Sequence, residues 1–144
     1  MTRVARGLGL ALIIVTALLP SRLFAESAAK PSYQDPAQLQ LLISNRTEPY
    51  FLVDVRTAAE YQKGHIPTAV NIPYDTIGAN PPTPDTAALI IVYCASGVRS
   101  GKAAKTLAGL GYGRVVDFGA FSRWQGPSLD GSDPGDCPCR VPLQ

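Results

Sequence analysis

Cys94 has the surroundings that a sulfur nucleophile requires. It follows an apolar run at 88–93 and precedes a short loop, 95–98, that contains Gly97 and is followed by Arg99. The backbone N–H groups of such a loop can converge on one point, and the positive end of a following helix adds to them. An anion is stable in that cradle, so the reactive thiolate is favoured over the thiol. We therefore predict that Cys94 is the catalytic residue.

The loop after Cys94 is predicted to bind the substrate. Small side chains leave its mouth open, a glycine permits a backbone conformation that other residues avoid, and an arginine adds a fixed positive charge. The same N–H donors would hold an anionic substrate or a persulfide on the sulfur. A lone cysteine at a strand end is more often simply a buried apolar side chain, and here the loop favours the catalytic interpretation. The predicted substrate-binding residues are Ala95, Ser96, Gly97, Val98 and Arg99.

Strands and helices alternate along the chain and position this loop. Apolar, β-branched runs predict strands at 50–55, 70–72, 88–93 and 114–118. Capping residues and apolar periodicity predict helices at 36–45, 57–63 and 98–109 and a short one at 120–125. Such alternation indicates a parallel α/β sheet. Cys94 then lies at the carboxyl edge of the sheet, where open α/β folds bind ligands.

Three motifs, in order along the chain, resemble the single-domain rhodaneses. Residues 92–104 (VYCASGVRSGKAA) are similar to the active-site loop and following helix of that family, whose pattern is C-x-x-G-x-R-S. The family has two other signatures. Its N-terminal signature resembles LVDVR at 52–56, Glu60-Tyr61 and GHIPTAVNIP at 64–73, and its C-terminal signature resembles VDFGAFSRW at 116–124. The family often has a second glycine at the position of Ala120. A chance match to all three motifs is implausible.

The resemblance implies both a fold and a reaction. The fold would be α/β, a rhodanese-like five-stranded parallel sheet flanked by helices, formed by residues 33–126. The reaction would move a sulfane sulfur from thiosulfate or a similar donor, through a persulfide on Cys94, to cyanide or a thiol acceptor. The partners would be a small sulfur-donor anion and that acceptor. No metal and no organic cofactor would be required.

Other polar residues near the predicted site have simpler explanations. Asp54 and Arg56 are candidates for catalytic support because they follow a strand, but they could equally hydrogen-bond the backbone or each other. His65, the only histidine, suggests a Cys-His pair. Its place in the His-Ile-Pro motif resembles a structural position in rhodaneses, and an ionised thiolate needs no base. Phe118 and Trp124 are expected in the core.

Three alternative functions remain open. Phosphatases that share the rhodanese fold resemble C-x5-R, whereas Arg99 is only five positions after Cys94, so the loop is better sized for sulfur than for phosphate. A thiol-redox or metal-binding function could use the pair Cys137-Pro-Cys139. Non-catalytic rhodanese-like binding modules commonly lack the loop cysteine that this chain has.

The amino-terminal residues predict export. Arg3 and Arg6 precede an uncharged apolar run at 8–19, which is shorter than the roughly 20 residues of a membrane span. We expect a signal peptide at 1–25 and a linker at 26–32. The mature protein would be periplasmic or secreted, without stable membrane association once cleaved.

The net charge of the expected mature chain limits the kinds of partner that it can bind. Loss of 1–25 removes three of the 13 basic residues and none of the 11 acidic ones, so the mature chain is nearly neutral. Nucleic-acid binding is therefore not expected. We also expect a monomer.

Residues 127–144 are rich in Gly, Pro, Asp and Ser and predict a flexible tail with the Cys-Pro-Cys pair.

Overall fold

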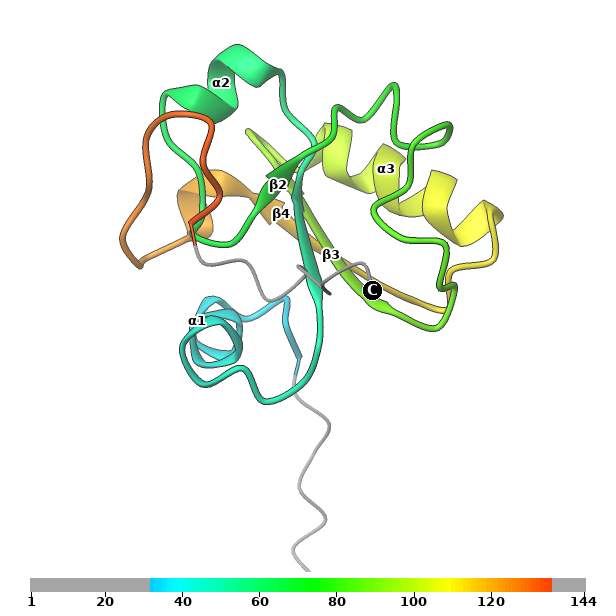
Figure 1. Cartoon of the computed structure of the whole chain (residues 1–144), viewed down its shortest axis with the longest axis horizontal. Coiled ribbons are helices and arrows are strands. Elements are labelled where there is room, and N and C mark those ends of the chain that lie inside the picture. The colour runs from blue at the N-terminus through cyan, green and yellow to red at the C-terminus, as the bar shows by residue number, and fades with distance from the viewer. Residues whose placement is uncertain (1–31, 136–144) are drawn as a thin grey trace, which may run out of the picture.

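A computed structural model describes residues 32–135, which fold into a sheet with helices on both faces (Figure 1). In chain order the elements are α1 (Pro36–Asn45), β1 (Phe51–Asp54), α2 (Ala58–Gln62), β2 (Val70–Asn71), β3 (Leu89–Cys94), α3 (Val98–Gly109), β4 (Arg114–Ala120) and the 3₁₀ helix η1 (Phe121–Arg123). The predicted signal peptide and the Cys137/Cys139 pair lie outside the described residues. Within 32–135 no helix has the length and apolarity of a membrane span.

The described strands form a parallel sheet in the order β2-β1-β3-β4. Both β1 and β4 pair with β3, which confirms the prediction that the strand before Cys94 is central. The sheet of the described residues has four strands, so the expectation of five is not met. That fifth strand came from the family resemblance, whereas this sequence offers only four apolar runs of strand type.

Local sequence signals account for the ends of the helices. The Asp35 carboxylate accepts a hydrogen bond of 2.8 Å from the Ala37 N–H at the start of α1, and Pro36 occupies the first turn. In α2 the capping box is complete: Thr57 Oγ1 accepts from the Glu60 N–H, and the Glu60 carboxylate accepts from the Thr57 N–H. Both helix starts agree with the sequence prediction.

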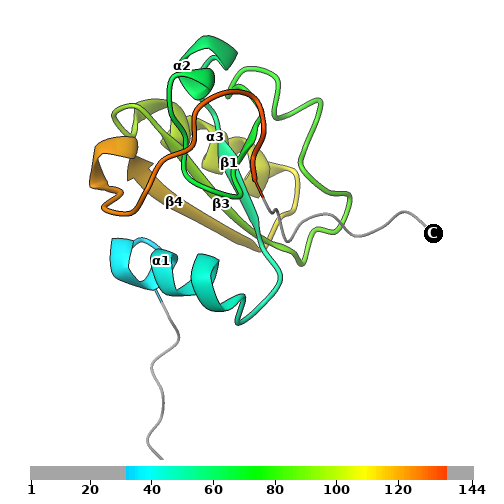
Figure 2. The same cartoon turned by 60° about the vertical axis from the view of Figure 1, so that its left-hand side comes forward.

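Apolar side chains pack on both faces of the sheet (Figure 2). On one face α1 contributes Leu39 and Leu42 to a cluster with Phe118. On the other face α3 contributes Ala103 and Leu107 to a second cluster. Because both faces are covered, all six residues of β3 are buried. The Cys94 side chain belongs to the cluster on the α3 face.

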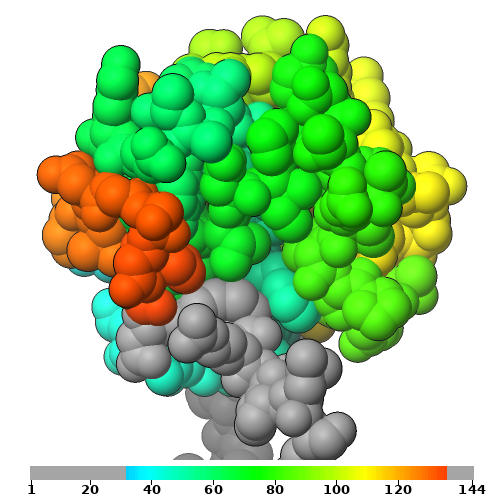
Figure 3. Space-filling view, turned by 45° about the horizontal axis from the view of Figure 1, so that its top comes forward, coloured from blue at the N-terminus to red at the C-terminus, as the bar shows by residue number. Residues whose placement is uncertain are grey.

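The chain beyond the predicted domain boundary at 126 also packs against the domain. Leu129 and His65 exchange two backbone hydrogen bonds of 2.9 Å, and the Thr68 N–H donates to the Pro134 carbonyl at 2.7 Å. The segment 127–135 therefore lies beside α2 (orange-red in Figure 3). This differs from the predicted flexible tail, because backbone hydrogen bonds hold a segment whose composition offers little apolar area.

Candidate active site

The loop after β3 is held by two glycines from different elements. Gly97, which precedes α3, has φ +94°, a conformation that favours glycine. A Cβ on Gly97 would lie 3.7 Å from the Gly119 Cα in β4. The β3–β4 register shifts at this point, so that Tyr93 pairs with Gly119 and Cys94 with Ala120. This irregularity brings the end of β4 against the loop, as bulges near active sites often do.

The Cys94 sulfur lies inside the loop and meets hydrogen-bond donors there. The Gly97 N–H donates to Sγ over 3.1 Å. The thiol is 3.7 Å from Ser100 Oγ, and that hydroxyl donates to the Gly97 carbonyl at 3.0 Å. Cys94 and Ser100 are both fully buried. The predicted cradle is therefore present around a free thiol.

The environment of Cys94 makes its thiol more acidic than usual. Burial raises the pKa, but hydrogen bonds from the backbone of Ser100, Ser96 and Gly97, and a hydrogen bond with the Ser100 hydroxyl, lower it. The hydrogen bonds prevail, and the pKa of Cys94 lies below its ordinary value. The loop therefore favours a thiolate.

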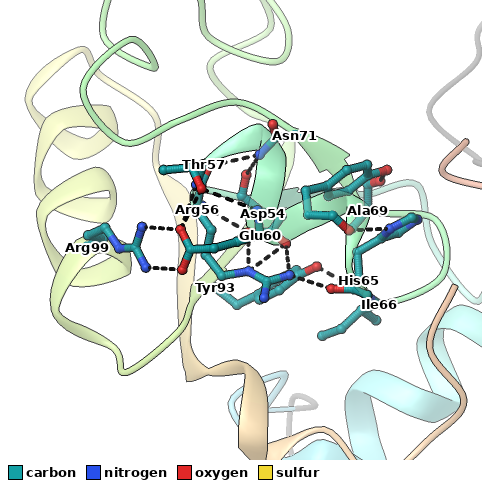
Figure 4. A network of polar contacts seen from close by, with 12 residues as sticks. Asp54, Arg56, Thr57, Glu60, His65, Ile66, Ala69, Asn71, Tyr93 and Arg99 are labelled. Atoms are coloured by element: carbon teal, nitrogen blue, oxygen red, sulfur yellow. Dashed lines mark hydrogen bonds and ion pairs between the residues drawn. The ribbon is translucent and has the colours of Figure 1, made fainter. Parts of the chain in front are cut away.

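The Arg99 side chain is bound to Glu60 of α2 rather than left open for a substrate. Its two terminal nitrogens meet the two Glu60 carboxylate oxygens at 2.7 and 2.8 Å (Figure 4). This pair holds the pKa of Glu60 well below its ordinary value. The guanidinium thus ties the first turn of α3 to α2. The predicted charge contact between Arg99 and an anionic substrate would have to form beside this ion pair.

Asp54 and Arg56 pair with each other in the buried turn after β1. Arg56 Nη2 lies 2.6 Å from Asp54 Oδ2 and also donates to the Gly64 carbonyl at 2.6 Å. The guanidinium carbon lies 4.6 Å from the centre of the Phe121 ring. Arg56 thus joins the end of β1 to Gly64, just after the end of α2, and to η1, in keeping with the simpler explanation of the two residues.

His65 is placed away from the loop by its own contacts. Its side chain is fully buried and stacks on the Tyr61 ring with 3.8 Å between centroids. Nδ1 lies 3.1 Å from the Tyr61 carbonyl oxygen and Nε2 lies 3.0 Å from the Asp133 carbonyl oxygen. Both ring nitrogens are therefore engaged with the backbone.

A pocket of ≈ 300 Å³ lies beside the loop, at the carboxyl edge of the sheet. Its walls include Arg56, Thr57, Tyr74, Asp75 and Arg99. The other loop side chains are open to solvent at this edge: Ala95 and Ser96 are exposed, and Val98 is 66% exposed. Arg99 is the loop residue on the pocket wall, whereas the fully buried Cys94 does not line this pocket.

Comparison with known protein families shows which family this chain belongs to. The Rhodanese-like domain family matches residues 35–126. The chain belongs to the rhodanese family. The resemblance seen in the three sequence motifs is thereby confirmed.

Individual rhodanese relatives agree with this membership. The chain is 38% identical over 87 residues to a thiosulfate:glutathione sulfurtransferase of Saccharomyces cerevisiae, with 51% of this chain and 63% of the yeast protein aligned. The alignment thus spans less than two thirds of that relative. Thiosulfate sulfurtransferase PspE of Escherichia coli is 33% identical over 81 residues, covering 55% of this chain and 78% of PspE. These relatives support the predicted enzyme class, a rhodanese-type sulfurtransferase.

A solved rhodanese has the same fold. The structure of a rhodanese with anions from E. coli superposes with a TM-score of 0.54 at 31% identity, covering 57% of this chain and 99% of that one. The α/β fold with a parallel sheet flanked by helices is therefore a rhodanese fold.

Two residues of this rhodanese site were not among the predicted site residues. Ser100 belongs to the C-x-x-G-x-R-S pattern, which could have indicated it, and its hydroxyl lies beside the Cys94 sulfur. Glu60 was noted in the sequence only as part of a helix cap and of a family signature, and no sequence spacing indicates its pairing with Arg99. Among residues 32–135 no group of metal-ligating side chains is gathered.

Proposed function

We propose that the protein is a single-domain sulfurtransferase that carries a sulfane sulfur as a persulfide on Cys94. The observation that carries this proposal is the Cys94 sulfur inside a loop whose Gly97 N–H donates to it over 3.1 Å. A thiolate stabilised by backbone amides is both a nucleophile and a group that a persulfide anion can replace in the same cradle.

The reaction consists of two displacements at sulfur. The Cys94 thiolate attacks the sulfane sulfur of thiosulfate, an S–S bond forms to Cys94, and the S–S bond of thiosulfate breaks with release of sulfite. The acceptor thiolate or cyanide then attacks the outer sulfur of the persulfide, and the Cys94 thiolate leaves. Negative charge stays on sulfur at the loop in the resting and loaded states, where the N–H donors hold it.

The proposed reaction does not use a general base from the described residues. The thiol is already more acidic than usual, so a partner is not needed to remove its proton. His65 is the residue that the sequence suggests as a base, but both of its ring nitrogens lie within hydrogen-bond distance of backbone carbonyl oxygens. The acceptor brings its own nucleophile.

Relatives suggest the classes of donor and acceptor. Two of them are a thiosulfate sulfurtransferase and a thiosulfate:glutathione sulfurtransferase by name. We propose thiosulfate or a similar anion as donor and a small thiol as acceptor for this chain. We further propose that it acts after export, on the basis of the leader-like residues 1–25.

Intact-mass analysis after incubation with thiosulfate tests this function. The mature protein should gain the mass of one sulfur, and a cyanide chase should remove it. Cys94→Ser should abolish both the gain and thiosulfate:cyanide sulfur transfer. A variant with both Cys137→Ser and Cys139→Ser is the matched control and should still take up one sulfur. Full activity in the Cys94→Ser variant would contradict the proposal.

A further inference from the structure

The loop that would carry the sulfur has an arginine whose charge is already compensated. The two terminal nitrogens of Arg99 each donate to one carboxylate oxygen of Glu60, at 2.7 and 2.8 Å. The two side chains keep 27% and 35% of their surface exposed, so the pair lies at the rim of the site. A guanidinium that holds a carboxylate in this bidentate way offers little net charge to a second anion.

Glu60 cannot easily leave this position because the cap of α2 also holds it. Its Oε2 accepts hydrogen bonds from the Thr57 N–H at 3.0 Å and from the Thr57 hydroxyl at 2.8 Å. A carboxylate that swung toward solvent would break the capping box as well as the ion pair. The compensation of Arg99 is therefore built into the fold of α2 and is not a chance surface contact.

The neighbouring charges of the pocket follow the same pattern. Arg56 on its wall is paired with the buried Asp54 carboxylate. Asp75 adds a negative charge to the wall, and Lys102 lies 5.7 Å from the centre of the Tyr74 ring at the rim. The charges around the pocket thus nearly cancel. The backbone amides of the loop are left as the main attraction for an anion, and no unpaired side-chain cation among the described residues of the pocket wall compensates a second negative charge.

We propose that Glu60 is a specificity-determining residue, which lowers the affinity of the site for the dianion thiosulfate and favours sulfane-sulfur donors with one negative charge. The favoured class comprises thiosulfonates and organic persulfides. This inference rests on the proposed sulfurtransferase function and adds to it the charge of the preferred donor.

Glu60→Gln tests the inference because it removes one charge while keeping the shape of the residue. Glutamine also serves in a capping box, so α2 is expected to form. With Arg99 uncompensated, the KM for thiosulfate should fall about fivefold, the size expected for a unit charge whose effect is screened by surrounding water. The KM for benzenethiosulfonate, a monoanion, should fall about half as much on a logarithmic scale, with kcat for both donors unchanged.

Glu48→Gln is the matched control. Glu48 also pairs with an arginine, Arg114, at 2.6 Å and with similar exposure, 29% and 37% for the two side chains. That pair lies at the amino end of β4, away from the loop. The substitution should leave the KM values for both donors as they are in the unsubstituted chain.

Arg99→Gln supplies a second variant of opposite sign. It leaves Glu60 as an uncompensated negative charge at the loop, so the KM ratio of thiosulfate to benzenethiosulfonate should rise. An unchanged KM ratio in Glu60→Gln would overturn the inference while leaving sulfur transfer through Cys94 intact. If Glu60→Gln fails to fold, an unchanged KM ratio in Arg99→Gln would overturn it in the same way. Failure of the unsubstituted chain to load sulfur from either donor would instead overturn the proposed function and this inference together.

Discussion

At the scale of single residues, the Cys94 thiol depends on its neighbour Ser100 for part of its acidity. The Ser100 hydroxyl and backbone N–H both lower the pKa of Cys94, against the effect of burial. The hydroxyl also contacts the Gly97 carbonyl, so it can turn from that oxygen toward a thiolate. Ser100 thus links the ionisation of the sulfur to the geometry of the loop.

Ser100→Ala should therefore raise the pKa of Cys94. A lowered pKa means that the thiolate forms at lower pH, so losing one hydrogen bond moves the rise in reactivity to higher pH. The measurement is the rate of Cys94 modification by iodoacetamide as a function of pH. Ser96→Ala is the control, because Ser96 lowers the pKa through its backbone N–H, which alanine retains. If the midpoint pH of Cys94 modification is the same in both variants, the Ser100 hydroxyl does not contribute to the acidity of the thiol.

The position of Cys94 at a strand end and the backbone cradle around its sulfur could be predicted from the sequence because both arise from local order. Cys94, Gly97 and the start of α3 lie within a few residues of one another, so strand, turn and helix signals place them. The side-chain partner of Arg99 could not be predicted in this way. Glu60 lies 39 positions earlier, and only the packing of α2 against α3 brings the two together.

At the scale of elements, α2 is a short helix with several structural duties. It has five residues, too few to be stable in isolation. Its capping box holds Glu60, its last turn supplies the Tyr61 carbonyl to His65, and the Gln62 carbonyl accepts from the Gly131 N–H at 2.8 Å. The helix α2 therefore contacts both the loop after Cys94, through Glu60, and the segment 127–135, through Gln62.

Thr57→Ala should destabilise the domain through α2. Loss of an N-cap hydroxyl costs about 1 kcal/mol of the free energy of unfolding. Thr106→Ala, at an exposed position in the last turn of α3, is the control and should change that free energy by no more than about 0.5 kcal/mol. Urea unfolding of the two variants compares them. Equal stability of both would show that the cap contributes little.

Element boundaries were predictable where capping residues mark them and less so elsewhere. Asp35 and Thr57 start helices as expected. Strand β4 runs to Ala120, beyond the predicted end at Phe118. Its register shift opposite Tyr93 depends on pairing with β3, which no local pattern in the sequence indicates.

At the scale of the whole molecule, the segment 127–135 completes the domain beyond the boundary set by sequence motifs. Its composition alone indicated flexibility, since few of its residues are apolar. Composition does not report backbone hydrogen bonds, and these hold the segment to residues 62–68. His65 adds a contact to the Asp133 carbonyl.

A chain ended after Gly126 should consequently be less stable than one ended after Gly135. The shorter chain loses the Leu129, Gly131 and Pro134 hydrogen bonds, each of which contributes about 1 kcal/mol. We expect a decrease of about 2–4 kcal/mol in the free energy of unfolding, measured by urea denaturation. The chain ended after Gly135 keeps all described contacts and is the control. Equal unfolding free energies would mean that the segment adds nothing.

The parallel sheet also bears on how the molecule folds. Every strand pair in it is parallel, so none is a hairpin, and Phe51 of β1 pairs with Ile90 of β3 across a long intervening stretch of chain. Such non-local pairing slows folding, because loop closure must precede the contacts that reward it. The Cys94 cradle needs β3, the end of β4 and the start of α3 in place at once. During folding the Cys94 thiol consequently stays accessible to oxidants until the central strands have assembled, and slow assembly of the sheet lengthens the time in which it can be oxidised.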